Sequence, residues 1–114
     1  MKTCKLKSNA PCANDIITKC LVEDLYSEEQ PFVRHFIEDN HTLTVLVAED
    51  YYLRINSTLS VIVIIDERAE FTEIEITANG GKSGLLQEGY GAEKSAVKKM
   101  VKILKQLGFI EVEN

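Results

Sequence analysis

The sequence is poor in proline, glycine and cysteine, and it has no long apolar run. It contains two prolines and six glycines, and no repeat, linker or low-complexity tract interrupts it. The longest apolar stretch, residues 59–65, has seven residues and is interrupted by Ser60, whereas a membrane-spanning helix needs about 20. Polar residues also break up the start of the chain, where a secretory signal would need an apolar segment. We therefore expect a cytoplasmic protein with no membrane partner.

The three cysteines, Cys4, Cys12 and Cys20, all lie in the first twenty residues. An odd number argues against a closed set of disulfides. Their even spacing of eight residues matches no metal-ligand pattern. We expect Cys4 and Cys20 to pack as small apolar side chains, and the sequence predicts neither a metal site nor a cofactor.

The composition is that of an ordinary globular domain. Of the 114 residues, 45% are hydrophobic and 27% are charged, which provides enough apolar surface to offset the entropy lost on folding. The length is typical of one domain, and we expect a single domain over residues 1–114. The net charge of −5 makes nucleic acid an unfavourable partner.

Apolar spacing predicts a helix in the first part of the chain. Residues 2–7 alternate weakly and favour a short edge strand. Helical spacing of apolar residues follows over residues 10–27, with a capping side chain and Pro11 at its start. Residues 32–37 are apolar without a clear period, so they fit either a short strand or a turn.

The middle of the chain alternates with a period of two and predicts an antiparallel meander of three strands. Residues 42–55 carry one apolar face that starts at Leu43 and continues to Tyr51. Residues 58–65 are apolar on both faces, which is typical of a central strand. Residues 71–78 alternate, and we expect four of them to face the core: Thr72, Ile74, Ile76 and Ala78.

A second helix is predicted over residues 92–107, where apolar residues form one stripe and lysines fill the other side. Gly108 follows as a C-cap, and residues 109–112 fit a short strand or a packed tail. The resulting fold class is α+β, in the order β-α-β-β-β-α. We expect an antiparallel sheet of four to five strands with both helices on one face.

When both helices cover one face of a sheet, any apolar residues on the other face stay exposed to water unless a partner covers them. Apolar surface would stay uncovered if the following residues point away from the helices: Leu46, Val61, Val63 and Ile65. We expect a homodimer to cover such a surface.

The loop Gly80-Gly81-Lys82-Ser83 ends like a phosphate-binding P-loop. The earlier glycine of that motif is replaced by Ile76, and Gly84 follows where a helix should begin, so we reject nucleotide hydrolysis. A backbone nest for an anion is the weaker alternative. We favour an ordinary loop whose glycines adopt positive φ.

The lysine-rich face of the last helix is the strongest charge feature of the sequence. Residues 93–105 carry a net charge of +4, against −9 for the rest of the chain. No arginine or aromatic residue accompanies these lysines, although both are usual in nucleic-acid recognition. We favour a solvated face over an anionic partner.

A Cys–His pair is the one nucleophilic arrangement left open. Cys20 and His35 can meet only in the fold, and a thiol on the buried side of a helix would be a poor nucleophile.

The tyrosines offer a further candidate. Tyr51 and Tyr52 point to opposite faces of their strand, and one of them would lie near Tyr90 and the glycine-rich segment. Such a cluster fits a ligand mouth, although ordinary sheet packing is the simpler interpretation.

Three segments together resemble a family of small bacterial proteins of unknown function that is common in Firmicutes. They are Glu-Asp-Tyr-Tyr-Leu-Arg at 49–54, Asn-Gly-Gly-Lys-Ser-Gly at 79–84, and Tyr-Gly-Ala at 90–92 before the lysine-rich helix. Family members carry a Tyr-Tyr-x-Arg strand, a Gly-Gly-x-x-Gly loop and an aromatic-Gly-Ala step. Tyr90 stands where many members have tryptophan. The resemblance covers residues 42–109 and implies a bacterial cytoplasmic protein, without an activity, substrate or catalytic residue.

We therefore expect a non-enzymatic, homodimeric binding module for a small molecule or a protein segment. Its groove would lie between the last helix, residues 80–91 and the tyrosine strand. The candidate ligand-binding residues are Tyr51, Tyr52, Arg54, Gly80, Gly81, Lys82, Ser83 and Tyr90. The alternatives are a small Cys/His hydrolase with an anion-binding loop at residues 80–84, and an assembly or chaperone-like protein that uses an apolar sheet face. We assign no catalytic or metal-binding residue.

Overall fold

The computed structural model describes residues 2–9, 14–25, 30–52, 57–80 and 87–112, which form an α+β fold. The strands are β1 (Lys2–Ser8), β2 (Phe32–Glu38), β3 (His41–Tyr52), β4 (Ser57–Arg68), β5 (Thr72–Gly80) and β6 (Ile110–Val112), and the helices are α1 (Asn14–Glu23) and α2 (Gln87–Gln106).

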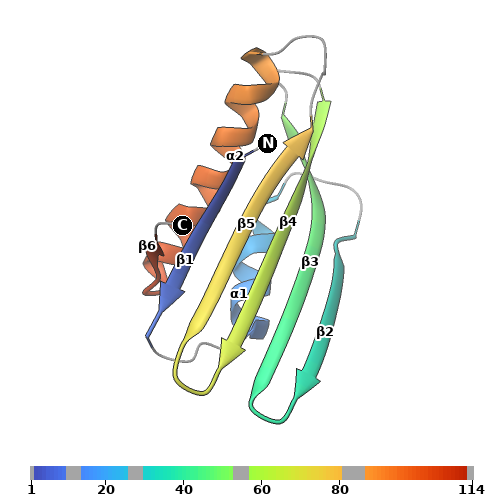
Figure 1. Cartoon of the computed structure of the whole chain (residues 1–114). Coiled ribbons are helices and arrows are strands. Elements are labelled where there is room, and N and C mark those ends of the chain that lie inside the picture. The colour runs from blue at the N-terminus through green and yellow to red at the C-terminus, as the bar shows by residue number, and fades with distance from the viewer. Residues whose placement is uncertain (1, 10–13, 26–29, 53–56, 81–86, 113–114) are drawn as a thin grey trace.

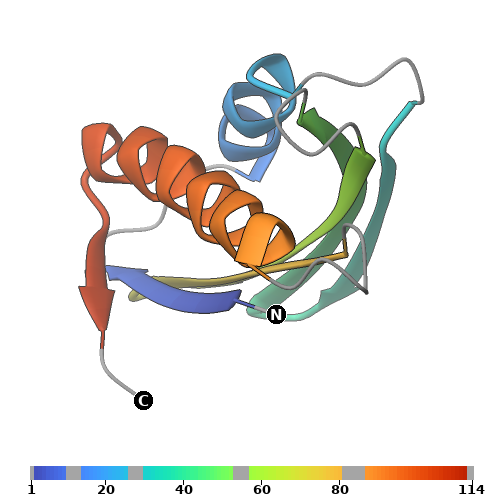
Figure 2. The same ribbon diagram turned by 90° about the horizontal axis from the view of Figure 1, so that it is seen from above.

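The strands form one antiparallel sheet in the order β2-β3-β4-β5-β1-β6 (Figure 1). Strands β2 to β5 are a meander, and the connection through α1 carries the chain from β1 to the far edge. Both helices lie on the concave side of the curved sheet (Figure 2). We call the other side the open face. The α+β class with two helices on one face is confirmed.

The sheet has six strands among the described residues, so the expected four to five is too few. The two segments that the sequence left open both form strands, because each finds a partner at a sheet edge. Strand β2 pairs with β3, and β6 pairs with residues Lys5, Leu6 and Lys7 of β1. Strand β1 is therefore not a simple edge strand, since β6 covers part of its outer side.

The helices differ from their predicted bounds. Helix α1 spans Asn14–Glu23, and residues 10–13 and 26–27 of the predicted helix lie outside the described residues. Helix α2 begins at Gln87, five residues before the predicted start, and so includes Gly91. Glycine disfavours helix by only about 1 kcal/mol, and packing of the buried residues Ala92 and Ala96 compensates for it.

The predicted C-cap of α2 is confirmed. Gly108 has a φ of +99°, and its amide donates to the carbonyl of Lys105 at 3.1 Å. The amide of Phe109 donates to the carbonyl of Leu104 at 3.0 Å. Positive φ turns the chain back towards the sheet, which buries Phe109 and starts β6.

The core lies between the helices and the concave side of the sheet. The expected inward residues of β5, which begin with Thr72 and Ile74, are buried. Cross-strand partners lie on the same face of a sheet, so the inward side of β5 determines the inward sides of β4 and β3. Ile74 pairs with Ile65, and Ile65 pairs with Thr44. The residues that would have left apolar surface uncovered by pointing away from the helices are buried beneath them: Leu46, Val61, Val63 and Ile65.

Candidate functional site

The predicted ligand-binding residues that the structure describes lie near one end of the sheet. Tyr52 ends β3, Gly80 ends β5, and Tyr90 lies near the start of α2. Four others lie outside the described residues: Arg54, Gly81, Lys82 and Ser83. A ligand site formed by all of these residues therefore stays a prediction.

Tyr51 lies on the side of the sheet away from α2. Its strand neighbour Asp50 is fully buried on the concave side, and strand alternation turns Tyr51 to the open face, where it is 37% exposed. Tyr51 therefore belongs with the exposed residues of the open face rather than with a groove beside the last helix.

A buried ion pair joins α2 to β3 at this end of the sheet. The Nζ of Lys99 lies 2.8 Å from Oδ2 of Asp50, whose side chain is 0% exposed, whereas that of Lys99 is 24% exposed. A carboxylate removed from water in this way needs a compensating charge. The pair therefore fixes the position of the helix over the sheet.

A second buried carboxylate occupies the start of the glycine-rich segment. The amide of Gly80 donates to Oε2 of Glu93 at 3.0 Å, and Gly80 has the positive φ of +131° expected for a loop glycine. The first amide of the proposed anion nest thus binds a carboxylate of the protein itself. The remaining residues of that nest, 81–84, lie outside the described part of the chain.

The open face carries a group of neighbouring apolar side chains on β2, β3 and β4, with Arg34 of β2 among them opposite Val45. Their register places them side by side, since Phe32 pairs with Val47 and Val47 pairs with Ile62. We call this group the apolar patch, and it consists of Phe32, Phe36, Leu43, Val45, Val47, Ile62 and Ile64. The uncovered apolar surface considered from the sequence therefore exists. On β3 and β4, it is formed by the residues that alternate with Leu46, Val61, Val63 and Ile65.

The rest of the open face is polar. On β5 and β1, Glu75 pairs with Lys5 across the strands, and their side chains form an ion pair at 3.7 Å. Glu73 and Lys7 form the next pair along the same face. The open face is thus divided into an apolar half and a half that carries both signs of charge.

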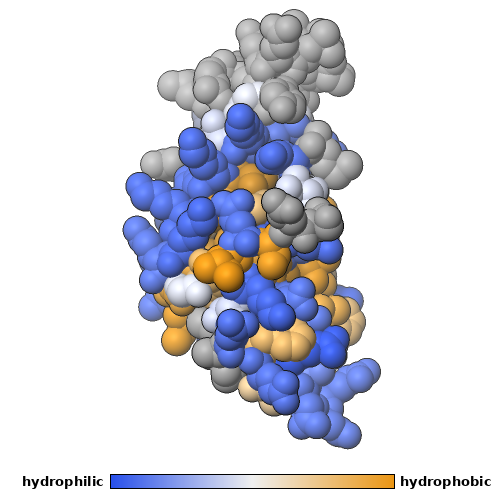
Figure 3. All heavy atoms as spheres, turned by 60° about the vertical axis from the view of Figure 1, so that its left-hand side comes forward, coloured by the Kyte–Doolittle hydropathy of each residue, from blue (hydrophilic) through white to orange (hydrophobic). Residues whose placement is uncertain are grey.

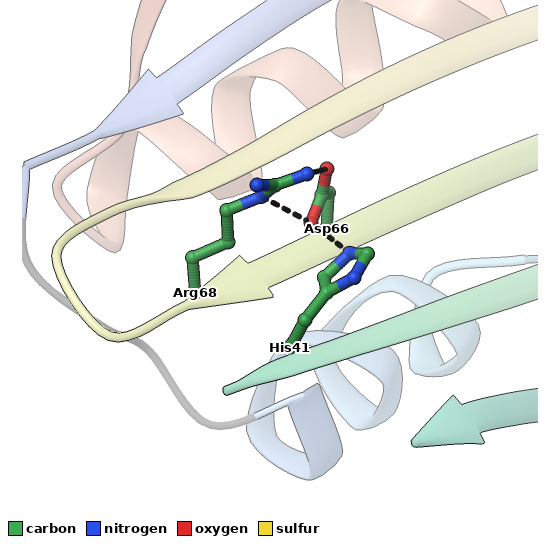
Figure 4. A network of polar contacts seen from close by, with 3 residues as sticks. All are labelled: His41, Asp66 and Arg68. Atoms are coloured by element: carbon green, nitrogen blue, oxygen red, sulfur yellow. Dashed lines mark hydrogen bonds and ion pairs between the residues drawn. The ribbon is translucent and has the colours of Figure 1, made fainter. Parts of the chain in front are cut away.

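A small charged network closes one end of the apolar patch (Figure 4). Oδ1 of Asp66 on β4 lies 2.6 Å from Nε2 of His41 on β3 and 3.3 Å from Nε of Arg68. Asp66 is the cross-strand partner of Leu43, a member of the patch. This network sets a polar boundary at the β3–β4 end of the patch.

A separate groove runs between α2 and the outer part of the sheet. It has a volume of about 530 Å³. Its lining residues come from β1, α2 and β6: Lys2, Thr3, Cys4, Lys5, Lys94, Val97, Lys98, Val101, Glu111 and Val112. We call it the basic groove. Figure 3 brings this side of the molecule forward and shows hydrophilic residues surrounding a smaller apolar area.

The thiol of Cys4 and the carboxylate of Glu111 influence each other in the basic groove. Burial raises the pKa of the Cys4 thiol, and the negative charge of Glu111 raises it further. A hydrogen bond and the charge of Lys105, whose Nζ lies 2.9 Å from Glu111, lower the pKa of the Glu111 carboxyl. Cys4 thus stays a protonated thiol at neutral pH, which does not favour a nucleophilic role.

Replacing Glu111 with glutamine is expected to lower the pKa of Cys4, because a negative charge that opposes the thiolate is lost. Alkylation of Cys4 by iodoacetamide, followed across pH by peptide mass spectrometry, should then reach half its maximal rate at lower pH. Cys20 on α1 is the internal control, and its profile should stay in place. A Cys4 profile that stays in place or moves to higher pH would contradict this assignment.

His35 lies beside a smaller hollow between α1 and β2. Its Nδ1 lies 2.7 Å from the hydroxyl oxygen of Thr44, which is fully buried. The hollow has a volume of about 290 Å³, and Cys20 is not among its described lining residues. The pair of Cys20 and His35 considered from the sequence is therefore not brought together at this hollow.

Sequence reasoning missed the basic groove. It treated the lysines of the last helix as a solvated face and residues 2–7 as a short edge strand, and it did not bring Lys2 and Lys5 together with that helix. The sequence signal was the presence of lysines in both segments, but only the tertiary structure brings β1 beside α2.

Within the described residues, no set of three or more His, Cys, Asp or Glu side chains is grouped so as to hold a metal ion. In the same part of the chain, neither helix combines the length and the apolar character needed to cross a bilayer.

Comparison with known proteins gives no match: no family model fits the chain, and no curated protein or solved structure is significantly similar to it. The resemblance to a family of small bacterial proteins therefore stays a prediction.

Proposed function

We propose that this chain is a non-enzymatic binding module that forms a homodimer through the apolar patch of its open face. The observation that supports this proposal is the continuity of the patch across three neighbouring strands. Phe32 and Phe36 are half exposed, and Val47 and Ile62 lie between β2 and the polar half of the face. Single exposed apolar residues are common on protein surfaces, but a contiguous patch marks an interaction site.

A second copy of the chain suits this surface. A two-fold axis brings the same patch of both copies together, so that apolar side chains meet apolar side chains. The neighbouring charges Lys5, Lys7, Glu73 and Glu75 then lie towards the rim, where water can reach them. Tyr51 lies on the same face as the patch, beyond Glu49 of β3, and its large side chain suits a protein interface.

The other interpretations have less support. A hydrolase would need an accessible nucleophile, whereas the hydroxyl beside His35 is fully buried and the thiol of Cys4 has a raised pKa. An assembly or chaperone-like protein would use the same patch for other chains. Self-association of the purified chain distinguishes a homodimer interface from a surface that binds other chains.

Sedimentation velocity tests the proposed homodimer. The molar mass obtained for the native protein is expected to be twice the 12.8 kDa mass of one chain. Replacing Ile62, a patch residue on β4 that is 37% exposed, with lysine should produce a monomer, because a charge would be buried in the interface. Far-UV circular dichroism should show an unchanged fold.

Thr3 provides the matched control. It is exposed on the same face, two strands away from Ile62 through Thr77, and Thr3→Lys should leave the dimer intact. A native protein that is monomeric at all concentrations would overturn the homodimer. So would an Ile62→Lys variant that dimerises as well as the native chain.

A further inference from the structure

The basic groove combines three features that point to one kind of ligand: lysines that form no ion pair with a described residue, an apolar floor, and a strand edge that no described strand covers. It lies at the β1–β6 side of the sheet, whereas the apolar patch lies on β2 to β4. The inference drawn from it goes beyond the proposed homodimer and does not depend on it.

The lysines are the first feature. Lys2, Lys94 and Lys98 line the groove, and none of them forms an ion pair with another described residue. The one carboxylate in the lining, Glu111, is engaged by Lys105 at 2.9 Å. On a chain with a net charge of −5, these ammonium groups form a local positive surface that attracts carboxylates.

The apolar floor is the second feature. Val97 and Val101 are one helical turn apart on α2, and both are buried against the sheet. Lys94 and Lys98 are also one turn apart and lie along the same side of the helix. A ligand in the groove therefore meets apolar atoms below and ammonium groups along the helix side.

The open strand edge is the third feature. Strand β5 pairs with every residue of β1 from Lys2 to Ser8, but β6 pairs only with Lys5, Leu6 and Lys7. On the outer side of Lys2, Thr3 and Cys4, no described strand is paired. These three residues line the basic groove, so an extended backbone there can form further strand hydrogen bonds.

We propose that the basic groove binds an extended acidic polypeptide segment, which adds to the outer edge of β1 beyond β6. The backbone of the segment pairs with the edge of β1 at Lys2, Thr3 and Cys4. Its acidic side chains reach Lys2, Lys94 and Lys98, and an apolar side chain lies on Val97 and Val101. Main-chain pairing of this kind supplies affinity, and the side-chain pockets supply specificity.

Other anionic ligands fit the groove less well. Nucleic acid is usually held by arginine and by aromatic stacking, and the described lining contains neither. A small anion would use the lysines but neither the valines nor the strand edge. An extended acidic segment is the ligand that uses all three features.

Fluorescence anisotropy with a labelled octapeptide of sequence Glu-Thr-Val-Thr-Glu-Thr-Val-Thr, whose glutamates and valines share one face of a strand, tests this site. The native protein should bind it, and binding should weaken as salt screens the lysines. Lys98→Gln should weaken binding about threefold, and Lys94→Gln with Lys98→Gln about tenfold, as for exposed ion pairs. Lys19→Gln, which removes an exposed lysine of α1 outside the groove, is the matched control and should change little.

Three further probes separate the parts of the proposal. An octapeptide of sequence Glu-Pro-Val-Pro-Glu-Pro-Val-Pro has the same charge and valines but lacks half of the backbone donors, and it should bind at least tenfold more weakly. Equal binding would overturn the strand addition. Tighter binding of oligothymidine than of the peptide would overturn the polypeptide ligand. Loss of peptide binding when the chain ends at Val112 would overturn the placement of the site on β1 and α2.

Discussion

Replacing Phe109 with alanine is expected to lower the free energy of unfolding by about 4 kcal/mol, as for other large-to-small changes in a core. Phe109 is 2% exposed and belongs to the largest buried side chains of the core. Its backbone is held by the C-cap of α2, where its amide donates to the carbonyl of Leu104. The substitution would leave a cavity that neither the capped helix end nor the sheet can easily close.

Chemical denaturation with urea measures this loss, provided that the m-value stays unchanged. The next residue, Ile110, is the matched control, because it is 62% exposed on β6. Ile110→Ala should cost well under about 1 kcal/mol. If the two substitutions cost the same, the burial of Phe109 between α2 and the sheet is contradicted.

Replacing Lys99 with methionine is expected to cost about 3 kcal/mol, because it removes the ammonium group from a buried carboxylate. Asp50 is 0% exposed, and its Oδ2 lies 2.8 Å from the Nζ of Lys99. Methionine keeps most of the length and apolar volume of the lysine stem, so the change tests the charge rather than the packing.

A double-mutant cycle measured by urea denaturation separates the ion pair from other effects. Asp50→Asn removes the buried charge, so Lys99→Met should cost less in that background than in the native chain. Lys98→Met alters the adjacent, exposed lysine and should have a small effect. Equal costs of Lys99→Met in both backgrounds would show that the ion pair does not stabilise the fold.

The two proposed surfaces lie on different parts of the sheet, and this separation has a functional consequence. The apolar patch lies on β2, β3 and β4, and the basic groove lies beside β1 and β6 at the other edge. A homodimer formed through the patch would therefore keep the groove of each copy accessible. On the two proposals together, the protein would present two equivalent grooves for acidic segments in one assembly.

Local patterns predicted most of the elements correctly. The period of two predicted β3, β4 and β5, and the inward set beginning with Thr72 and Ile74 is confirmed, because polar residues alternate with apolar ones along β5. The apolar stripe and Gly108 predicted the end of α2. These features follow from the chain itself, since strand alternation, helical spacing and positive φ depend on neighbouring residues.

Faces and edges could not be predicted in the same way. Strand β4 is apolar on both sides, and the apolar face predicted for β3, which starts at Leu43, lies on the open side, so alternation does not say which side the helices cover. The pairing of β4 with β5, and of β3 with β4, determines which face of each strand packs under the helices. It places Leu46 in the core and Val47 on the open face. The same face choice affects the candidate ligand site. Tyr51 lies on the open face of β3 and therefore points away from α2.

By itself, the sequence determined the α+β class, the meander, the end of the second helix and the presence of surplus apolar surface. Only the tertiary structure decided where that surface lies, that β2 and β6 form strands, and that Lys2 lines the same groove as Lys94 and Lys98 of α2. The physical reason is the range of the interactions. Periodicity is set by residues a few positions apart, whereas register, edge pairing and the basic groove bring together residues about a hundred positions apart, such as Lys5 and Val112.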